Sequence, residues 1–432
     1  MVFGTDVAKH CAHNKIPGYS TMSKPDHLIN FIRTLYHEPE AFIPLHDPRF
    51  IGNEKKYLME CIDSNFVSSV GEFVGRFERM CAEYTGAKYA VAAMNGTSAL
   101  HIALQLAGVR SGDEVITQAL TFIATANAIS YTGAEPVFID VDRDTLGLSP
   151  AALSRWLEEN AELRETDQVS VTRSRSPVPG IGDPLSTRSK HIPVPFNKTT
   201  NRRITACVPM HTFGHPVKLD EIKEILSRFN IPMIEDAAES IGSFYKAKHT
   251  GTFGETGILS FNGNKVITTG GGGMILTDDR ETALAAKHLT TQAKVPHAWE
   301  YKHDEIAYNY RLTNIAAALG CAQMETLGHM LNMKRELAEK YRDFFASTEY
   351  EFFAEPENCR SNYWLNTIIT PDKRKRDELL EYTNKNGVMT RPAWEPMNRL
   401  PMFSRCQTDG LENTAWFADR LVNVPSSVPM KQ

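Results

Sequence analysis

The chain has 432 residues, 42% of them hydrophobic and 23% charged, which is typical of a globular protein with two or three domains. The net charge is −5, from 47 basic and 52 acidic residues, and this argues against a nucleic-acid-binding protein, which usually carries a basic excess. No apolar run reaches the ~20 residues of a membrane span, and no signal-peptide pattern or CxxC pair is present. We therefore expect a cytoplasmic protein with reduced thiols, no metal site and no membrane or nucleic-acid partner.

The sequence predicts helices in the first part of the chain and, after them, strands that alternate with helices. Residues 27–36 and 50–84 carry apolar residues at helical spacing. Strands and helices then alternate, which predicts crossover connections and a mostly parallel sheet with helices on both faces. The predicted strands occupy residues 88–94, 114–117, 136–140, 204–210, 232–236, 258–261 and 273–277, and the predicted helices residues 97–106, 123–132 and 219–229.

Two changes of composition divide the chain. Residues 165–203 are rich in Pro, Ser, Thr, Arg and Lys, which predicts a flexible insert: we favour a solvated insertion over a basic flap above an anionic substrate. Beyond residue 301, helices at 315–345 and 376–386 and a strand at 363–370 indicate a smaller domain. The predicted division is an N-terminal arm or helix (1–45), a large α/β domain (46–300) and a small C-terminal α+β domain (301–432).

One lysine stands between a strand end and four glycines, in Ser260-Phe-Asn-Gly-Asn-Lys265-Val-Ile-Thr-Thr-Gly270-Gly-Gly-Gly273. Four glycines lose much entropy on ordering, so such a run is expected where the chain passes close to a ligand. The lysine precedes the glycines, which is not the order of a phosphate-binding P-loop. Alone, Lys265 carries little weight, because most lysines are solvated surface groups.

Carboxylates follow a predicted strand in Ile234-Glu235-Asp236-Ala-Ala-Glu239. In open α/β sheets ligands bind at the carboxyl ends of the strands. A carboxylate that caps the next helix is the alternative, and we prefer it for Glu235. Asp236 is therefore the better candidate for a site residue.

Two further motifs stand at strand-to-helix junctions. In Asn95-Gly96-Thr97-Ser98 a glycine and two hydroxyl residues precede a helix, where free N–H groups and the positive helix end favour a phosphate. Thr97 or Ser98 serves equally well as a plain helix cap. Phe122 either stacks on a planar ligand or packs in the core. A phosphate cradle, an acid, a lysine and an aromatic face together suit pyridoxal phosphate.

On these motifs the chain resembles the DegT/DnrJ/EryC1/StrS family of sugar aminotransferases, which are fold-type I pyridoxal-phosphate enzymes. The resemblance covers residues from about 44 to about 427, with residues 165–203 as an insertion. It implies a mostly parallel seven-stranded sheet domain followed by a smaller α+β domain. The motifs that carry it are Asn95-Gly-Thr-Ser-Ala-Leu, Thr121-Phe-Ile-Ala-Thr, Pro136-Val-Phe-Ile-Asp, Pro209-Met-His-Thr-Phe-Gly214, Glu235-Asp-Ala-Ala, Ser260-Phe-Asn-Gly-Asn-Lys and Tyr308-Asn-Tyr-Arg311.

Carried over by position, the resemblance implies that Lys265 forms the Schiff base with the cofactor and that Asp236 pairs with its ring nitrogen. Phe122 would stack on the ring. The family usually has glutamine where Glu239 stands, near the phenolic oxygen of the cofactor. We expect Glu239 to be protonated or turned toward a cation, since an ionised acid there would be repelled.

The remaining roles implied by the resemblance concern the phosphate, the substrate and a second subunit. Asn309 would reach the cofactor phosphate of the neighbouring subunit, which implies a homodimer with shared sites. His211 would lie near the substrate pocket. The residues expected to hold the phosphate within the subunit are Gly96, Thr97, Ser98 and Ser260.

The implied reaction transfers an amino group from glutamate to C4 of a nucleotide-linked 4-keto-6-deoxy-N-acetylhexosamine, as in legionaminic acid and bacillosamine routes to surface glycans such as lipopolysaccharide. A keto-sugar nucleotide of the C3 or perosamine type is an alternative substrate. The resemblance is also compatible with a sugar dehydratase and with a non-catalytic relative that binds sugar nucleotides. Some dehydratases of the family carry histidine in place of the lysine, so Lys265 favours transamination.

Overall fold

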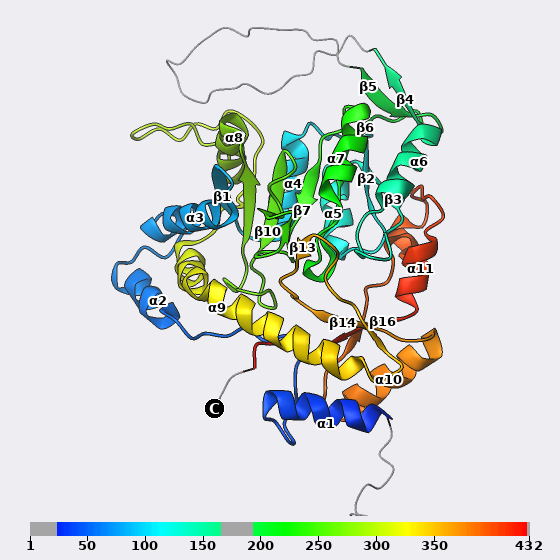
Figure 1. Cartoon of the computed structure of the whole chain (residues 1–432). Helices are drawn as coiled ribbons and strands as arrows, with labels where there is room; N and C mark the ends of the chain where they lie inside the picture. The colour runs from blue at the N-terminus through cyan, green and yellow to red at the C-terminus, as the bar shows by residue number, and fades with distance from the viewer. Residues whose placement is uncertain (1–23, 166–192, 430–432) are drawn as a thin grey trace, which may run out of the picture.

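Seven strands form the central sheet of this computed structural model, which describes residues 24–165 and 193–429. They are β1 (Tyr89–Ala93), β2 (Glu114–Gln118), β3 (Glu135–Ile139), β6 (Ile204–Val208), β7 (Ile234–Asp236), β10 (Thr256–Ser260) and β11 (Gly273–Thr277). Their order is β3-β2-β6-β7-β10-β11-β1, with β6 and β7 joined by isolated parallel bridges (Figure 1). β11 is antiparallel to both neighbours and the other pairs are parallel, which confirms the predicted mostly parallel sheet.

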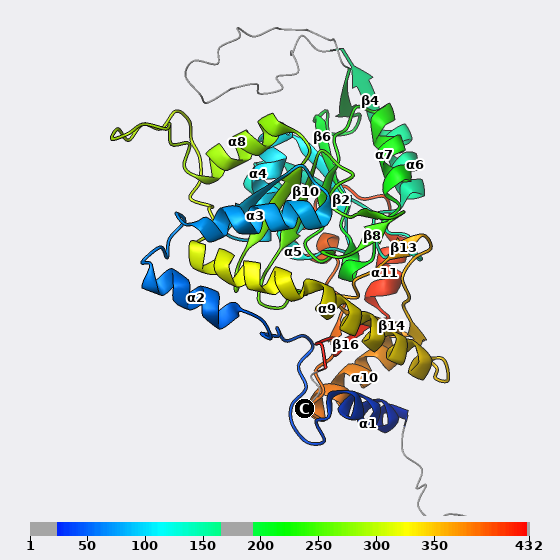
Figure 2. The ribbon, with the colours of Figure 1, turned by 60° about the vertical axis from the view of Figure 1, so that its left-hand side comes forward.

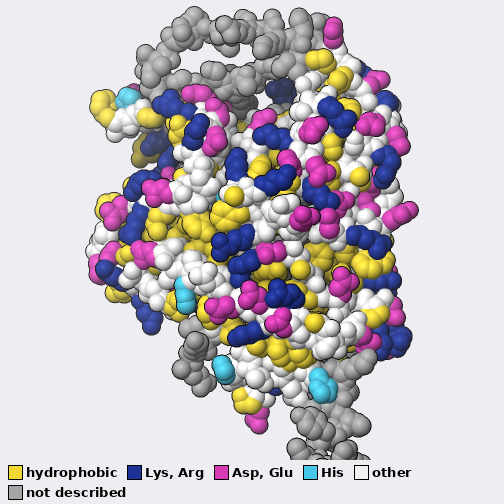
Figure 3. Space-filling view, in the orientation of Figure 1, with side chains coloured by type: hydrophobic (Ala, Val, Ile, Leu, Met, Phe, Trp, Pro, Cys, Tyr) yellow, Lys and Arg dark blue, Asp and Glu magenta, His cyan; other side chains and the backbone are white. Residues whose placement is uncertain are grey.

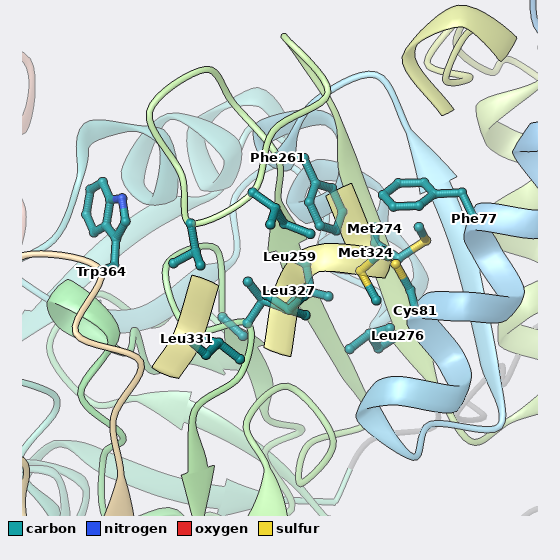
Figure 4. Close-up of a cluster of buried hydrophobic side chains, with 14 of the residues drawn as sticks. Phe77, Cys81, Leu259, Phe261, Met274, Leu276, Met324, Leu327, Leu331 and Trp364 are labelled. Atoms are coloured by element: carbon teal, nitrogen blue, oxygen red, sulfur yellow. The ribbon is translucent and has the colours of Figure 1, made fainter. Parts of the chain in front are cut away.

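Helices cover both faces of this sheet. Other helices, among them α1 and α10, lie away from it, and the helices of the described chain are α1 (Lys24–Tyr36), α2 (Glu54–Asp63), α3 (Glu72–Thr85), α4 (Gly96–Leu106), α5 (Ile123–Tyr131), α6 (Pro150–Asn160), α7 (Leu219–Arg228), α8 (Arg280–Thr290), α9 (Asn314–Phe345), α10 (Lys373–Lys385) and α11 (Glu412–Ala418). Successive strand residues point to opposite faces. Ile258 and Ile275 pack with α4, α5 and α8, whereas Leu259 and Met274 pack with α3 and α9 (Figure 4). All five residues of β2, β10 and β11 are buried, as expected of strands covered on both sides.

The long helix α9 contributes to two hydrophobic cores. Its first half packs on the sheet through residues such as Ala318 and Leu327. Its second half, through Leu337 and Tyr341, packs with α1 and α10 on a four-stranded antiparallel sheet (Figures 1 and 2). That sheet has the order β12-β14-β16-β15, with β12 (Glu351–Phe352), β14 (Asn366–Ile369), β15 (Arg391–Pro392) and β16 (Leu421–Val424). The domain boundaries after residues 45 and 300 stay predictions.

The short elements complete the described chain. They are β4 (Ala161–Arg164), β5 (Val194–Asn197), β8 (Phe244–Tyr245), β9 (Lys248–His249), β13 (Cys359–Arg360) and the 3₁₀ turns η1 (Thr212–Gly214), η2 (Met397–Arg399) and η3 (Pro401–Phe403). Across the described ranges, no helix combines the length and the apolar character that a membrane crossing requires.

The predicted insert over residues 165–203 lies mostly outside the described residues, which omit 166–192. Residues 194–197 were expected to be part of a loop, and here the prediction is wrong, because they form β5 and pair with β4. The side chains of β5 alternate between half-buried and buried. Asn197 is fully buried and donates to Glu114 Oε2 at 2.7 Å, which ties this two-stranded ribbon to β2.

Candidate active site

A cavity of about 300 Å³ lies at the carboxyl ends of β1, β7 and β10. This is the edge where ligands bind in open α/β sheets. Parallel strands end at the same edge, so residues far apart in the sequence meet there. The predicted site residues that line the cavity are Gly96, Thr97, Phe122, Asp236, Glu239, Ser260 and Lys265.

Lys265 lies in the loop after β10, and its side chain reaches into the cavity. Its Nζ is 3.2 Å from Glu239 Oε1 and 3.9 Å from the ring centroid of Trp364. The residue is 9% exposed, so the amine reaches a partner molecule only through the cavity. An aromatic face and a carboxyl group thus hold the amine from two sides.

The glycine run after Lys265 allows two segments of the backbone, the start of β11 and the turn before α4, to pack closely. A Cβ on Gly273 would lie 2.3 Å from the carbonyl oxygen of Asn95, and one on Gly272 would lie 2.2 Å from Thr269 Oγ1. Only glycine therefore lets β11 begin directly against the turn that opens α4. The run brings the lysine loop and the turn before α4 together.

Asp236 ends β7 and is buried. Its Oδ2 accepts a hydrogen bond from Thr125 Oγ1 at 2.7 Å, and its Oδ1 accepts one from Ala238 N at 3.2 Å. Both donors fix the carboxylate in one orientation at the cavity wall. A fixed buried carboxylate is suited to hold a positively charged ring nitrogen.

Glu239 lies between Lys265 and the loop at η1. Phe213 N donates to its Oε2 at 2.9 Å, while its Oε1 faces Lys265. Burial raises the pKa of this carboxyl to about 7, and the neighbouring Lys265 opposes the rise. Glu239 is therefore turned toward a cation, one of the two arrangements expected from the sequence.

We expect Glu239→Gln to change the pH dependence of stability. The folded chain keeps the carboxyl proton up to about pH 7, whereas the unfolded chain loses it near the ordinary pKa of 4.5. Between these values the folded state binds more protons, so the wild-type chain loses stability as the pH rises through this window. Relative to wild type, the variant should gain about 1–3 kcal/mol of unfolding free energy between about pH 5 and pH 8.

Urea unfolding of the cofactor-free wild-type and Glu239→Gln chains at about pH 5 and about pH 8 measures this change in unfolding free energy. Gln keeps an oxygen that accepts from Phe213 N, while its amide nitrogen replaces the oxygen that faces Lys265, so the ionisation is read from how the difference between the two chains changes with pH. Parallel pH profiles for the two chains would contradict the raised pKa of Glu239.

The turn before α4 has the form expected of a phosphate cradle. A Cβ on Gly96 would lie 3.0 Å from Ser260 Cβ, so glycine leaves room between the turn and the end of β10. Asn95 caps the helix: its Oδ1 accepts from Ser98 N at 2.7 Å and from Ser98 Oγ at 2.9 Å. Ser98 donates to this cap and does not line the cavity, whereas Thr97 and Ser260 do.

His211 is not brought into the cavity. It is fully buried, with Nε2 3.2 Å from Glu235 Oε2 and with Nδ1 accepting from Val217 N at 3.3 Å. Glu235 in turn accepts hydrogen bonds from Gly251 N and Gly254 N, both at 2.7 Å. This pair orders the loop behind Asp236, and a substrate contact by His211 is not supported by its position.

Asn309 lines a second cavity, of about 750 Å³, and is absent from the first. It pairs with Thr291 in an isolated antiparallel bridge. Ser69, Val70 and Arg311 also line this second cavity. Within one subunit, Asn309 and Lys265 therefore belong to different cavities.

Two tryptophans complete the first cavity and were not among the predicted site residues. Trp364 lies beside Lys265, and the ring of Trp394 lies 6.0 Å from that of Phe122. Phe122 is 46% exposed, which fits a ring that faces the cavity rather than the core. Both tryptophans come from the last seventy residues, far from every motif in the sequence.

Similarity to known proteins agrees with this geometry. A family model described as the DegT/DnrJ/EryC1/StrS aminotransferase family matches residues 49–163 and 193–432. The chain belongs to this family.

Relatives agree with this family, and a solved structure agrees with the fold. A GDP-perosamine synthase of Escherichia coli O157:H7 is 37% identical over 387 residues, which cover 89% of this chain and 93% of that protein. A GDP-perosamine synthase of Vibrio cholerae is 32% identical over 391 residues, covering 89% and 94%. The crystal structure of the aminotransferase TlmJ from Streptoalloteichus hindustanus matches with a TM-score of 0.75 at 24% identity, covering 91% of this chain and 95% of that one.

This family member is therefore a pyridoxal-phosphate-dependent sugar aminotransferase, which acts on a nucleotide sugar with an amino donor. This confirms the predicted family, enzyme class, cofactor and fold. The cavity fits that cofactor: an amine for its aldehyde (Lys265), a buried carboxylate for its ring nitrogen (Asp236) and a helix start with Gly96 and Thr97 for its phosphate.

Proposed function

We propose that the enzyme moves an amino group from glutamate to C4 of a nucleotide-linked 4-keto-6-deoxy sugar. The observation that carries the proposal is the cavity that joins Lys265, Asp236 and the start of α4. The bound cofactor carries the amino group between the two substrates and withdraws electrons from the carbon that is deprotonated. We place this amine transfer in the cytoplasm.

Each residue of the cavity has a separate role in the proposed reaction. Lys265 Nζ takes the α-proton of glutamate, and later delivers a proton to the sugar carbon that receives the amine. Asp236 keeps the ring nitrogen of the cofactor protonated through its negative charge. Gly96, Thr97 and Ser260 bind the phosphate, and Phe122 covers the ring. Glu239 holds the amine of Lys265 in place between these steps.

The relatives favour a GDP-linked sugar as the acceptor. Two proteins that cover 89% of this chain are named GDP-perosamine synthases, which supports the perosamine-type alternative over an N-acetylated sugar of the legionaminic acid type. We therefore propose a GDP-linked 4-keto-6-deoxyhexose, and a surface polysaccharide as the destination of the product.

Mass spectrometry of the products tests this assignment. The purified enzyme is incubated with glutamate and either a GDP-linked 4-keto-6-deoxyhexose or a UDP-linked 4-keto-6-deoxy-N-acetylhexosamine. We expect an aminated GDP-sugar and equimolar 2-oxoglutarate. Amination of the UDP-linked sugar alone would overturn the GDP assignment, and no amination of either sugar would overturn the proposed C4 reaction.

We also propose that the enzyme is a homodimer in which Asn309 completes the site of the partner subunit. The second cavity, with Asn309, lies next to a group of exposed apolar side chains around α2. Figure 3 shows hydrophobic side chains gathered around the start of α9, on the same side of the molecule. A self-complementary interface is a common way to cover such a surface. The apolar side chains are Phe50, Ile51, Met59, Ile62, Phe66, Val67 and Val70.

Complementation tests the shared site. We expect Lys265→Ala and Asn309→Ala each to lack amine transfer, whereas co-expression of the two chains should restore about a quarter of wild-type activity per site. The reason is that half of randomly paired dimers are mixed, and each mixed dimer has one site with Lys265 from one chain and Asn309 from the other. Activity that stays at the level of the separate variants would show that Asn309 acts within its own subunit or not at all.

A further inference from the structure

Trp394 lies in the segment between β15 and η2, which connects the two sheets of the molecule. On one side, Arg391 and Pro392 pair with β16 of the small sheet. On the other side, Met397 N donates to Ala119 O at 3.0 Å, directly after β2 of the central sheet. The segment is therefore fixed at both ends, and it holds Trp394 in the wall of the first cavity.

Aromatic rings continue from Trp394 to the cofactor lysine. The ring centroid of Trp394 lies 4.9 Å from that of Phe213, and the ring centroid of Phe213 lies 6.5 Å from that of Trp364. Trp364, labelled in Figure 4, has its ring centroid 3.9 Å from Lys265 Nζ. In the other direction, the ring of Trp394 lies 6.0 Å from that of Phe122. Trp394 thus closes an aromatic wall between the reactive amine and the ring expected to cover the cofactor.

The two tryptophans of this wall differ in what their side chains are free to bind. Trp364 is 4% exposed, and its indole N–H donates to Asn264 O at 2.7 Å, so it belongs to the structure around the lysine loop. Trp394 is half-buried, and among the described residues no atom accepts a hydrogen bond from its indole N–H. An indole that presents both its face and an N–H donor to a cavity suits a ligand that is apolar on one side and carries hydroxyl groups at its edge.

The sugar proposed above as the acceptor has this chemistry. The pyranose ring of a 6-deoxyhexose presents C–H groups on its faces and a methyl group at C6, beside hydroxyl groups at its edge. Its C4 must come close to Lys265, and the aromatic wall begins at that amine. Glutamate differs, because its two carboxylates call for cationic partners, which the face of an indole does not provide. Of the two substrates, the sugar is therefore the one that fits Trp394.

We propose that Trp394 is a specificity-determining residue that binds the pyranose ring of the acceptor sugar, with its ring against the apolar face of the sugar and its N–H donating to a sugar hydroxyl. This assignment rests on the proposed transfer to a nucleotide-linked 6-deoxy sugar. It gives Trp394 no part in the reaction with glutamate. The two halves of the amine transfer therefore report differently on this residue.

Single-turnover kinetics of the holoenzyme measure the two halves separately. In the glutamate half, the enzyme with lysine-bound cofactor is mixed with glutamate. In the sugar half, the amine-loaded enzyme is mixed with the GDP-linked 4-keto-6-deoxyhexose. We expect Trp394→Leu to lower the second-order rate constant of the sugar half by about 10- to 100-fold, the combined effect of one stacked ring and one hydrogen bond. The glutamate half should stay close to wild type.

A merely structural role for Trp394 gives a different pattern. Trp394 also contacts Phe122, so a displaced cofactor would slow both halves alike. Equal losses in the two halves, or an unchanged sugar half in a folded Trp394→Leu chain, would overturn the proposal. Trp416→Leu is the matched control: Trp416 is also half-buried, but it contacts Arg143 and Arg420 outside the cavity, and its loss should leave both halves unchanged.

Ligand binding gives a readout without turnover. Isothermal titration of the amine-loaded enzyme compares GDP with the GDP-linked 4-amino-4,6-dideoxyhexose, which has no keto group to react with that form. Trp394→Leu should weaken the binding of the amino sugar by about tenfold or more and leave the binding of GDP unchanged. Equal affinities of the wild-type and variant chains for the amino sugar would contradict the proposal.

A conservative variant keeps the test decisive if Trp394→Leu fails to fold. Trp394→Phe retains a ring face without the N–H, so it should slow the sugar half alone, by about 3- to 10-fold, and unchanged kinetics there overturn the proposal. The comparison uses whichever of the two keto sugars the wild-type enzyme aminates, since both carry the 6-methyl group. Amination of neither sugar by the wild-type enzyme overturns the proposed reaction, whereas wild-type amination that Trp394→Leu leaves intact overturns only the role of Trp394.

Discussion

Lys265→Ala should abolish amine transfer, with a loss of at least about 10³-fold, because no second amine among the described residues lines the cavity to bind the cofactor aldehyde and to move the α-proton. Lys265 is the one lysine among the sixteen described residues around this cavity. The measurement is single-turnover conversion of glutamate to 2-oxoglutarate by the holoenzyme. The visible absorbance of the lysine-linked cofactor should disappear with the activity.

Lys218→Ala is a matched control for this variant. Lys218 pairs with Asp142 and Asp144 and lies outside the cavity. Its loss should leave both turnover and absorbance close to wild type. Turnover by Lys265→Ala within tenfold of wild type would show that another group activates the cofactor.

The sheet could be predicted because its strands carry their signal locally. Residues 114–117 (Glu-Val-Ile-Thr) and 273–277 (Gly-Met-Ile-Leu-Thr) are short runs centred on apolar and β-branched residues that are buried on both faces, and turn residues separate them from neighbouring helices. The helices α6 and α8 were not predicted, although Ser149, Pro150 and Asp279 mark their starts as caps or first residues. Capping signals for both helices were therefore present in the sequence.

The cavity residues that stand at or directly after strand ends could be predicted from the sequence. Asp236 and Ser260 stand at the last positions of β7 and β10, and Gly96 opens α4, so one edge of the sheet collects them. Trp364 and Trp394 reach the cavity from the chain around a second sheet. No pattern in the sequence tells how that sheet is placed against the first, because its position depends on the packing of α9 in both cores.

Asp236→Asn should lower the rate of amine transfer by about 10²–10³-fold while the cofactor still binds. Asparagine has the size of aspartate and keeps one oxygen that accepts from Thr125 Oγ1, while its amide nitrogen replaces the oxygen that accepts from Ala238 N, so the variant removes the negative charge together with that longer hydrogen bond. Without that charge the ring nitrogen of the cofactor loses its proton more easily, and the ring withdraws electrons less well. Single-turnover kinetics with glutamate, together with a titration of cofactor binding, separate the two effects.

Thr125→Val separates the charge of Asp236 from its orientation. The substitution removes the 2.7 Å hydrogen bond to Oδ2, but it leaves the carboxylate and its contact with Ala238 N. One neutral hydrogen bond to a charged group contributes about 1.5–3 kcal/mol, so we expect a loss of about tenfold to a hundredfold at most, smaller than that of Asp236→Asn. The order of the two losses distinguishes charge from orientation, because only the negative charge of Asp236 keeps the ring nitrogen of the cofactor protonated. If Thr125→Val is the more damaging variant, Asp236 acts through packing and the electrostatic role assigned to it here is wrong.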